Sequence, residues 1–123
     1  MDVVQGMTLS TVQEDDRVAI QLEGELDFAS AQRLIDAIED CLVEQTKVCL
    51  INCQQVTFID TECLKSIIYM KHNLATRGID LCIEQCSTQV SRVIKMLGLT
   101  EFFQMPLTLQ SEQAASSTPR SFI

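Results

Sequence analysis

The segment that most constrains how this chain folds is residues 56–64, which read Val-Thr-Phe-Ile-Asp-Thr-Glu-Cys-Leu. An apolar, strand-like run ends there in Asp60 and Thr61, and an amphipathic helical pattern follows at once. This order places the Thr61 hydroxyl in the first turn of a helix, at a surface bend with free backbone N–H groups nearby. Because such a position suits the addition and removal of a phosphate, the segment favours a protein that is switched over one that performs chemistry.

Two strand patterns lie before this segment. Thr8–Gln13 and Arg17–Glu23 flank a polar turn at 14–16, an arrangement typical of a β-hairpin. In the second pattern every other residue is a large apolar one, which predicts that one face of the strand is buried. The residues concerned are Val18, Ile20 and Leu22.

The rest of the chain alternates between helical and strand patterns. Residues 24–27 are expected to form a bend before a helix that runs to about Val43 and is capped by Asp27 or Ser30. The further predicted elements are a strand over 47–53, a helix over 61–76, a strand over 79–84, a helix over 88–97 and a core-closing segment over 99–109. The strand over 47–53 is nearly all apolar, which is typical of a central strand covered on both faces. The inward residues expected in the last helix are Val90, Val93, Ile94 and Leu97.

A hairpin followed by strand–helix–strand units predicts an α/β fold with a mixed sheet of about four to five strands and helices packed on it. We expect one domain over residues 8–109, preceded by a leader at 1–7. From residue 110 to 123 the chain is rich in Ser, Gln and Ala, and we expect this tail to be disordered.

Composition narrows the classes of function. The net charge of −8 argues against non-specific binding to nucleic acid, which needs a basic face, and fits a partner with a basic surface. No apolar run approaches the about 20 residues of a membrane span, so direct membrane insertion is not expected. The N-terminus lacks the basic and apolar regions of a signal peptide, and we therefore expect a cytoplasmic protein.

The six cysteines fall inside predicted elements or at their edges, which favours reduced thiols packed as small apolar side chains over a disulfide framework. Their spacings are not those of zinc ribbons, and His72 is the single histidine, so no metal or other cofactor is expected. The sequence shows no nucleophile–base pair and no phosphate-binding glycine loop. Catalysis is accordingly not expected, and His72 is interpreted as an exposed side chain.

Four stretches and one asparagine together resemble a known family. Residues 57–64 are similar to the family's "TFMDSSGL" segment, and Asn52 lies eight residues before Asp60, as the family pattern requires. Leu-Glu-Gly-Glu-Leu-Asp at 22–27 resembles "L-x-G-E-L-D". The start of the last helix at 87–93 and the segment 97–103 agree in order and spacing. Over about residues 8–105 the chain thus resembles the STAS domain of bacterial anti-anti-sigma factors.

The resemblance implies a partner-switching mechanism. In such proteins the hydroxyl after the Asp is phosphorylated by an anti-sigma factor that is a serine/threonine kinase of the histidine-kinase-like ATPase superfamily. The unphosphorylated form binds that kinase and frees a sigma factor, and a metal-dependent serine/threonine phosphatase resets the switch. By position, Thr61 is the phosphoacceptor here, and Asp60 and Asp27 match the family's flanking acids. Glu62, Lys65 and Tyr69 extend the expected partner-binding surface along the helix.

Two residues depart from the family pattern. The family usually has Ser or Ala in place of Glu62, and Gly in place of Cys63. Glu62 adds a permanent negative charge beside Thr61, and Cys63 removes the close backbone approach that Gly allows. Both changes leave the fold prediction intact and bear on how a kinase docks.

Other interpretations of the same residues stay open at this stage. Asp60 and Thr61 are also typical of a plain helix N-terminus without a regulatory role, and Lys65 and Tyr69 of a solvated helix face. A non-enzymatic accessory subunit of a transporter of the lipid-transport ATPase type, or of a signalling assembly, would use the same face with Thr61 unmodified. A response-regulator receiver domain is disfavoured, because residues 1–27 lack an adjacent acid pair after a parallel first strand. Whether the chain forms a weak homodimer is left open.

Overall fold

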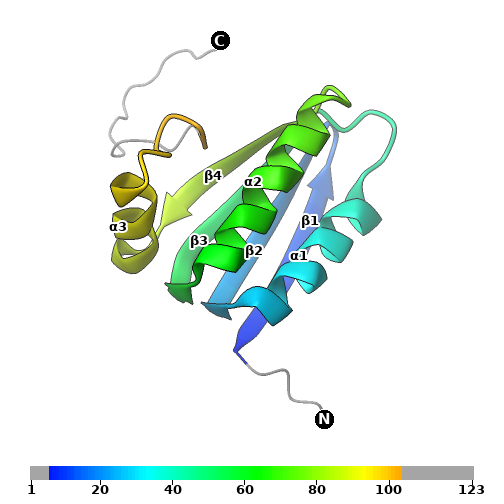
Figure 1. Ribbon diagram of the computed structural model, residues 1–123. Coiled ribbons are helices and arrows are strands. Elements are labelled where there is room, and N and C mark those ends of the chain that lie inside the picture. The colour runs from blue at the N-terminus through cyan, green and yellow to red at the C-terminus, as the bar shows by residue number, and fades with distance from the viewer. Residues whose placement is uncertain (1–5, 104–123) are drawn as a thin grey trace.

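The computed structural model describes residues 6–103, which form a four-stranded sheet and three helices in the order β-β-α-β-α-β-α (Figure 1). The elements are β1 (Met7–Glu14), β2 (Arg17–Leu26), α1 (Phe28–Cys41), β3 (Val48–Ile59), α2 (Thr61–Ala75), β4 (Asp80–Cys86) and α3 (Thr88–Met96). In space the strands follow the order β1-β2-β3-β4, with β1 antiparallel to β2 and the other two pairs parallel. The predicted hairpin, mixed sheet and α/β class are therefore confirmed.

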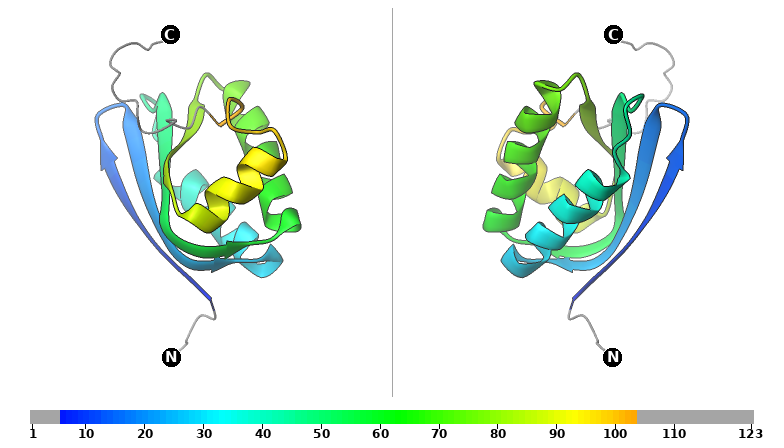
Figure 2. Two further views of the ribbon diagram at one scale, coloured as in Figure 1. Left: turned by 90° about the vertical axis from the view of Figure 1, so that its left-hand side faces the viewer. Right: turned by 90° about the vertical axis from the view of Figure 1, so that its right-hand side faces the viewer.

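The helices form one layer on one face of the sheet. α1 and α2 lie side by side across the strands in Figure 1, and Figure 2 shows the curved sheet wrapping around the helical side. The predicted alternation in β2 is confirmed, because Val18, Ile20 and Leu22 are all buried. Phe103 is fully buried and its carbonyl accepts a hydrogen bond from the N–H of Ile83, so residues 99–103 close the core as predicted. Residues 104–109, and the tail predicted from 110, lie outside the described residues.

Two strands are longer than predicted. Residues 24–26, expected to form a bend, continue β2, and the strand predicted over 47–53 joins the strand-like run before Asp60 into one strand, β3, that ends at Ile59. Leu26 and Ile59 are register partners, so the two extensions pair with each other. Irregularities in the β2–β3 register beside Gly24 accommodate its unusual backbone within the strand. Pairing with a strand that is distant in the sequence therefore kept residues 24–26 extended, although their local sequence favours a turn.

Two predictions of burial are wrong. The helix-facing residues of β3 are buried, but Leu50 on the opposite face is only half-buried, because no element of residues 6–103 covers that face. Leu97, expected to face inward, is 53% exposed because α3 ends at Met96 and Leu97 is its C-cap. The inner face of α2 is as expected, with Cys63, Ile67, Met70 and Leu74 all buried.

Gly24 occupies a position that tolerates no side chain. Its φ is +96°, and a Cβ added there would overlap the carbonyl oxygen of Gly6, whose own position is held by the N–H of Glu25 at 2.6 Å. Gly78 also has a positive φ of +77°, but a Cβ there would meet nothing within 4 Å.

These two glycines give a matched test of the close approach between Gly24 and the carbonyl of Gly6. We expect Gly24→Ala to lower the free energy of unfolding by about 3 kcal/mol, from backbone strain plus overlap. Gly78→Ala, which has the strain alone, should cost about 1 kcal/mol. Urea unfolding followed by circular dichroism measures both, and equal losses would show that the approach to Gly6 is not a constraint.

Candidate functional site

The candidate site lies where two helices begin next to each other. β2 and β3 are parallel and end as register partners at Leu26 and Ile59, so the residues that follow them emerge at one edge of the sheet (Figure 1). These residues are Asp27 and Asp60, and each is the N-cap of the helix that follows. The strand–acid–helix pattern therefore occurs twice, side by side, and brings two helix N-termini together.

Asp60 contacts both helices at once. Its Oδ1 accepts a hydrogen bond from the N–H of Cys63 at 2.7 Å, which caps α2, and its Oδ2 accepts one from the N–H of Phe28 at 3.1 Å, in the first turn of α1. Its own N–H donates to the carbonyl of Leu26 at 3.0 Å, at the end of β2. A single residue thus joins the start of both helices to the edge of the sheet.

Asp27 is held by Ser30. One carboxylate oxygen, Oδ1, accepts hydrogen bonds from the Ser30 N–H and the Ser30 hydroxyl, each at 2.9 Å. These two bonds lower the pKa of Asp27 below its ordinary value of 3.8, so the carboxylate is ionised at neutral pH. Of the two cap candidates in the sequence, Asp27 is the cap and Ser30 is a buried donor to it.

The structure brings the predicted phosphoacceptor to this paired N-terminus. Thr61 is the first residue of α2 and is exposed, directly after the double cap at Asp60. Glu62 beside it is also exposed, and its Oε2 lies 3.5 Å from the Nζ of Lys65 one turn later. Tyr69, a further turn along, is 74% exposed. Thr61, Glu62, Lys65 and Tyr69 therefore form one outward strip along α2, whereas Asp27 lies at the start of the neighbouring helix α1.

Two exposed aromatic residues at this site were not singled out from the sequence. Phe28 is 67% exposed and Phe58 is 49% exposed, each next to a strand end or cap described above. In the sequence, Phe28 lies three residues before Ala31 and seven before Ile35 of the apolar stripe, so helical periodicity gave no sign that it is exposed. Phe58 sits in a strand whose length was underestimated, so its outward direction could not be derived. Phe28 directly follows Asp27 in the chain, and Phe58 lies two residues before Asp60.

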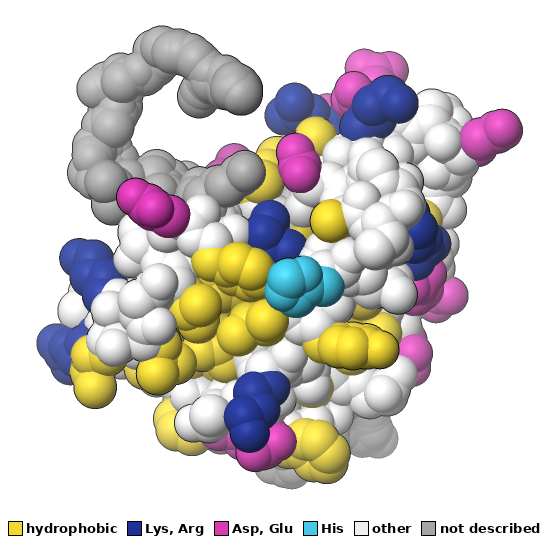
Figure 3. Space-filling view, turned by 45° about the horizontal axis from the view of Figure 1, so that its top comes forward, with side chains coloured by type: hydrophobic (Ala, Val, Ile, Leu, Met, Phe, Trp, Pro, Cys, Tyr) yellow, Lys and Arg dark blue, Asp and Glu magenta, His cyan; other side chains and the backbone are white. Residues whose placement is uncertain are grey.

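Further along α2, a second apolar region forms around Phe102. Its ring centroid lies 5.5 Å from that of His72 and 5.0 Å from that of Phe103, and the Nζ of Lys71 is 5.7 Å from it. The Lys71 ammonium also donates to the carbonyl of Leu81 at 2.7 Å. Figure 3 shows hydrophobic side chains gathered beside the histidine on this face. His72 is exposed, as predicted, and its ring is in contact with an aromatic neighbour.

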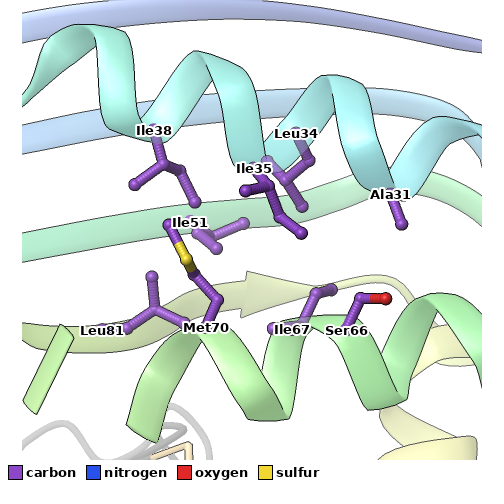
Figure 4. Close-up of a pocket in the computed structure, with 9 residues that line it drawn as sticks. All are labelled: Ala31, Leu34, Ile35, Ile38, Ile51, Ser66, Ile67, Met70 and Leu81. Atoms are coloured by element: carbon purple, nitrogen blue, oxygen red, sulfur yellow. The ribbon is translucent and has the colours of Figure 1, made fainter. Parts of the chain in front are cut away.

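The space between α1 and α2 is filled by side chains. Nine residues line it, and it leaves no room for a water molecule (Figure 4). They are Ala31, Leu34, Ile35, Ile38, Ile51, Ser66, Ile67, Met70 and Leu81. The arrangement is that of a packed helix interface rather than a pocket for a small ligand.

Within residues 6–103, no group of three or more His, Cys, Asp or Glu side chains is placed to hold a metal ion. None of the helices in that range is long and apolar enough to cross a membrane.

Cys63, which lies directly below the cap of α2, is fully buried. Burial, followed by the charges of Asp60 and Asp27, raises the pKa of its thiol to about 12. It is therefore a neutral packing residue and not a nucleophile.

Comparisons with known proteins give one family model that matches the chain and several solved structures that share its fold. A family model described as the STAS domain matches residues 8–114. A solved anti-sigma factor antagonist from Mycobacterium paratuberculosis gives a TM-score of 0.72 at 20% identity, covering 90% of this chain and 94% of that chain. The anti-sigma factor antagonist SpoIIAA in its unphosphorylated form gives 0.68 at 16% identity, covering 85% of this chain and 93% of its own. No curated protein sequence matches the chain.

Two further structures show the range of proteins that share this fold. SpoIIAA from Bacillus in its phosphorylated form gives a TM-score of 0.63 at 15% identity, covering 85% of this chain and 96% of that chain. A sulfate transporter family protein from Wolinella succinogenes gives 0.63 at 21% identity, covering 75% of each chain. At these identities the likeness concerns the fold, and it spans both signalling and transporter proteins.

The double cap at Asp60 makes a testable prediction about stability. Removing one helix cap typically costs about 1 kcal/mol, and Asp60→Ala removes the partner of two helix N–H groups, so we expect a loss of about 2 kcal/mol. The matched control is Ser87→Ala, because Ser87 caps α3 alone through the N–H of Val90 at 3.2 Å, and it should cost about 1 kcal/mol. Urea unfolding measures both variants. A loss for Asp60→Ala no larger than the control would mean that the bond to Phe28 contributes nothing.

Proposed function

The chain belongs to the STAS domain family, and from that premise we propose that it is a cytoplasmic anti-sigma factor antagonist controlled by phosphorylation of Thr61. Its unphosphorylated form binds an anti-sigma kinase of the histidine-kinase-like ATPase superfamily and so frees a sigma factor or another output protein. A metal-dependent serine/threonine phosphatase restores that form. The protein acts by binding and carries out no catalysis itself.

One observation carries this proposal: Thr61 is exposed in the first turn of α2, directly after the cap residue Asp60, whose hydrogen bonds are already formed. A kinase can reach its hydroxyl without unfolding the helix. Both carboxylate oxygens of Asp60 are occupied by backbone N–H groups of the two helices. A phosphate on Thr61 therefore adds charge to a rigid surface, and does not replace an existing cap.

Electrostatics favours release at an interface. A phosphate adds about −1.5 to −2 charges at neutral pH, and the helix N-terminus stabilises it by about 1 kcal/mol. Asp60 and Glu62 lie beside it and oppose it, on a chain whose net charge is already −8. A partner docked over this edge meets both repulsion and steric overlap. The switch thus needs no refolding of the domain.

The two departures from the family pattern are compatible with this mechanism. The side chain of Cys63 is fully buried, so it adds no atoms to the surface on which a kinase docks. Glu62 forms an ion pair with Lys65 at 3.5 Å, so the ammonium of Lys65, one turn further along α2, partly balances the negative charge of Glu62. Because both side chains of the pair are largely exposed, the pair adds little to stability, and its effect is on the surface charge.

A second function is favoured by a specific neighbour. The sulfate transporter family protein from Wolinella succinogenes shares this fold, so a STAS domain also occurs in a transporter context. As an accessory subunit, the chain would hold a permanent partner on the same face of α2, with Thr61 unmodified.

Phosphosite mapping separates the two functions. The protein is isolated from its own host, growing and stressed, and its phosphosites and co-purifying proteins are identified by mass spectrometry in one run. We expect condition-dependent phosphate on Thr61, with an ATPase-fold kinase bound to the unmodified form alone. Thr61→Val should keep that partner under every condition, and Thr61→Asp should weaken binding at least about tenfold through charge repulsion. An unmodified Thr61 under all conditions, together with a constant partner, would instead establish the accessory subunit.

The exposed aromatics predict where the partner contacts the domain. We expect Phe28→Ala to weaken binding of the captured partner about tenfold, because a ring beside the paired helix N-termini is desolvated on docking. The matched control is Met96→Ala, since Met96 is 78% exposed and lies on α3, away from the site. Its effect should stay within about twofold. Titration calorimetry measures both variants, and equal effects would place the footprint elsewhere.

A further inference from the structure

A pair of cysteines lies on adjacent strands, apart from the site described above. Cys53 in β3 and Cys86, the last residue of β4, are register partners in the parallel ladder. Neighbouring strands run about 4.8 Å apart, which falls inside the span of about 4.4 to 6.8 Å between the Cα atoms of a disulfide. The backbone geometry therefore permits a bond between the two sulfur atoms with small movements of the side chains.

The backbone around this pair is well anchored. The N–H of Ser87, which follows Cys86, donates to the carbonyl of Cys53 at 3.1 Å. The hydroxyl of Ser87 also caps α3, and α3 packs against β3. The two cysteines are thus held next to each other by the chain that leads from β4 into α3, and the proximity does not depend on a mobile segment.

The two thiols differ in exposure. Cys53 is 1% exposed, whereas Cys86 is half-buried and open to solvent on one side. The Cys53 thiol donates a hydrogen bond to the sulfur of Cys86, which lowers the pKa of Cys86 and raises that of Cys53. Burial raises the pKa of the thiols at Cys49 and Cys63 instead. Of this pair, Cys86 is therefore the thiol that solvent can reach, and its register partner Cys53 supplies a second thiol beside it.

We propose that Cys53 and Cys86 form an oxidation site, at which hydrogen peroxide converts the two thiols into an intramolecular disulfide. In the first step the Cys86 thiolate attacks one peroxide oxygen, the O–O bond breaks, and after protonation of the leaving oxygen the products are a sulfenic acid and water. In the second step the sulfur of Cys53 attacks the sulfur of the sulfenic acid and its proton leaves with the hydroxyl as a second water. The peroxide gains the two electrons that the two thiols lose.

The test is peptide mapping of the purified, reduced full chain after treatment with hydrogen peroxide under native conditions. Remaining thiols are alkylated, and the chain is digested with trypsin without reduction. Tryptic cleavage places Cys53 in peptide 48–65 and Cys86 in peptide 78–92. We expect these two peptides to be joined through Cys53 and Cys86, with the loss of two alkylatable thiols and complete reversal by dithiothreitol.

Two variants make the result specific. Cys86→Ser, at a half-buried position, should abolish the cross-link without disturbing the core. Cys82→Ser is the matched control, because Cys82 lies in the same strand and the same tryptic peptide, and it should leave the cross-link unchanged. Circular dichroism of each variant checks that it is folded.

Several outcomes would overturn the proposal. They are a sulfenic or sulfinic acid on Cys86 without a cross-link, a cross-link through Cys49, Cys63 or Cys82, and a disulfide between two chains. The site does not involve Thr61, so a Thr61→Val variant should form the same cross-link. Failure of the phosphorylation switch and failure of the oxidation site are therefore observed separately.

Discussion

The carboxylate of Asp60 is the interaction on which the rest of the site depends. It accepts the N–H of Cys63 in α2 and the N–H of Phe28 in α1, while its own N–H binds the carbonyl of Leu26. Buried or half-buried helix ends need partners for their N–H groups, and here one side chain serves two helices. The bond to Phe28 links residues 32 positions apart, so it also sets how the helices lie relative to each other. Because Thr61 directly follows Asp60, these hydrogen bonds also fix the position of Thr61.

Two helix N-termini that one carboxylate holds together suit the proposed switch, which works through charge. The donors around Asp60 and Asp27 are already satisfied, and the space between α1 and α2 is packed, so the domain has little room to rearrange. The proposed switch therefore acts through the outer surface, where Thr61, Glu62 and the two exposed aromatic residues lie. In the switch that we propose, a phosphate on Thr61 would change which partner binds without changing the fold.

The thiols show how the same residue type takes different roles in one core. Cys63 is sealed below the cap of α2, where burial keeps it neutral and unreactive. Cys86, at the end of a strand, is partly open to solvent and receives a hydrogen bond from Cys53. The expectation of reduced thiols holds for all six cysteines, which are free, and the strand register places Cys53 beside Cys86, as the proposed oxidation site requires. The difference comes from location in the fold, since the residue type is identical.

The sequence by itself determined the features that depend on a few neighbouring residues. The cap at Asp60, the buried stripe of α2, the alternation in β2 and the family motifs at 22–27 and 57–64 are all local, because helix caps and periodic burial depend on residues close together in the chain. Only the tertiary structure decided the features that join distant segments. The pairing of Leu26 with Ile59 extended both strands beyond their predicted ends, the second bond of Asp60 reached the other helix, and the open face of the sheet left Leu50 half-buried. Each depends on strand register and on which layer covers which face, and no short stretch of sequence specifies either, since both arise from contacts between residues far apart in the chain.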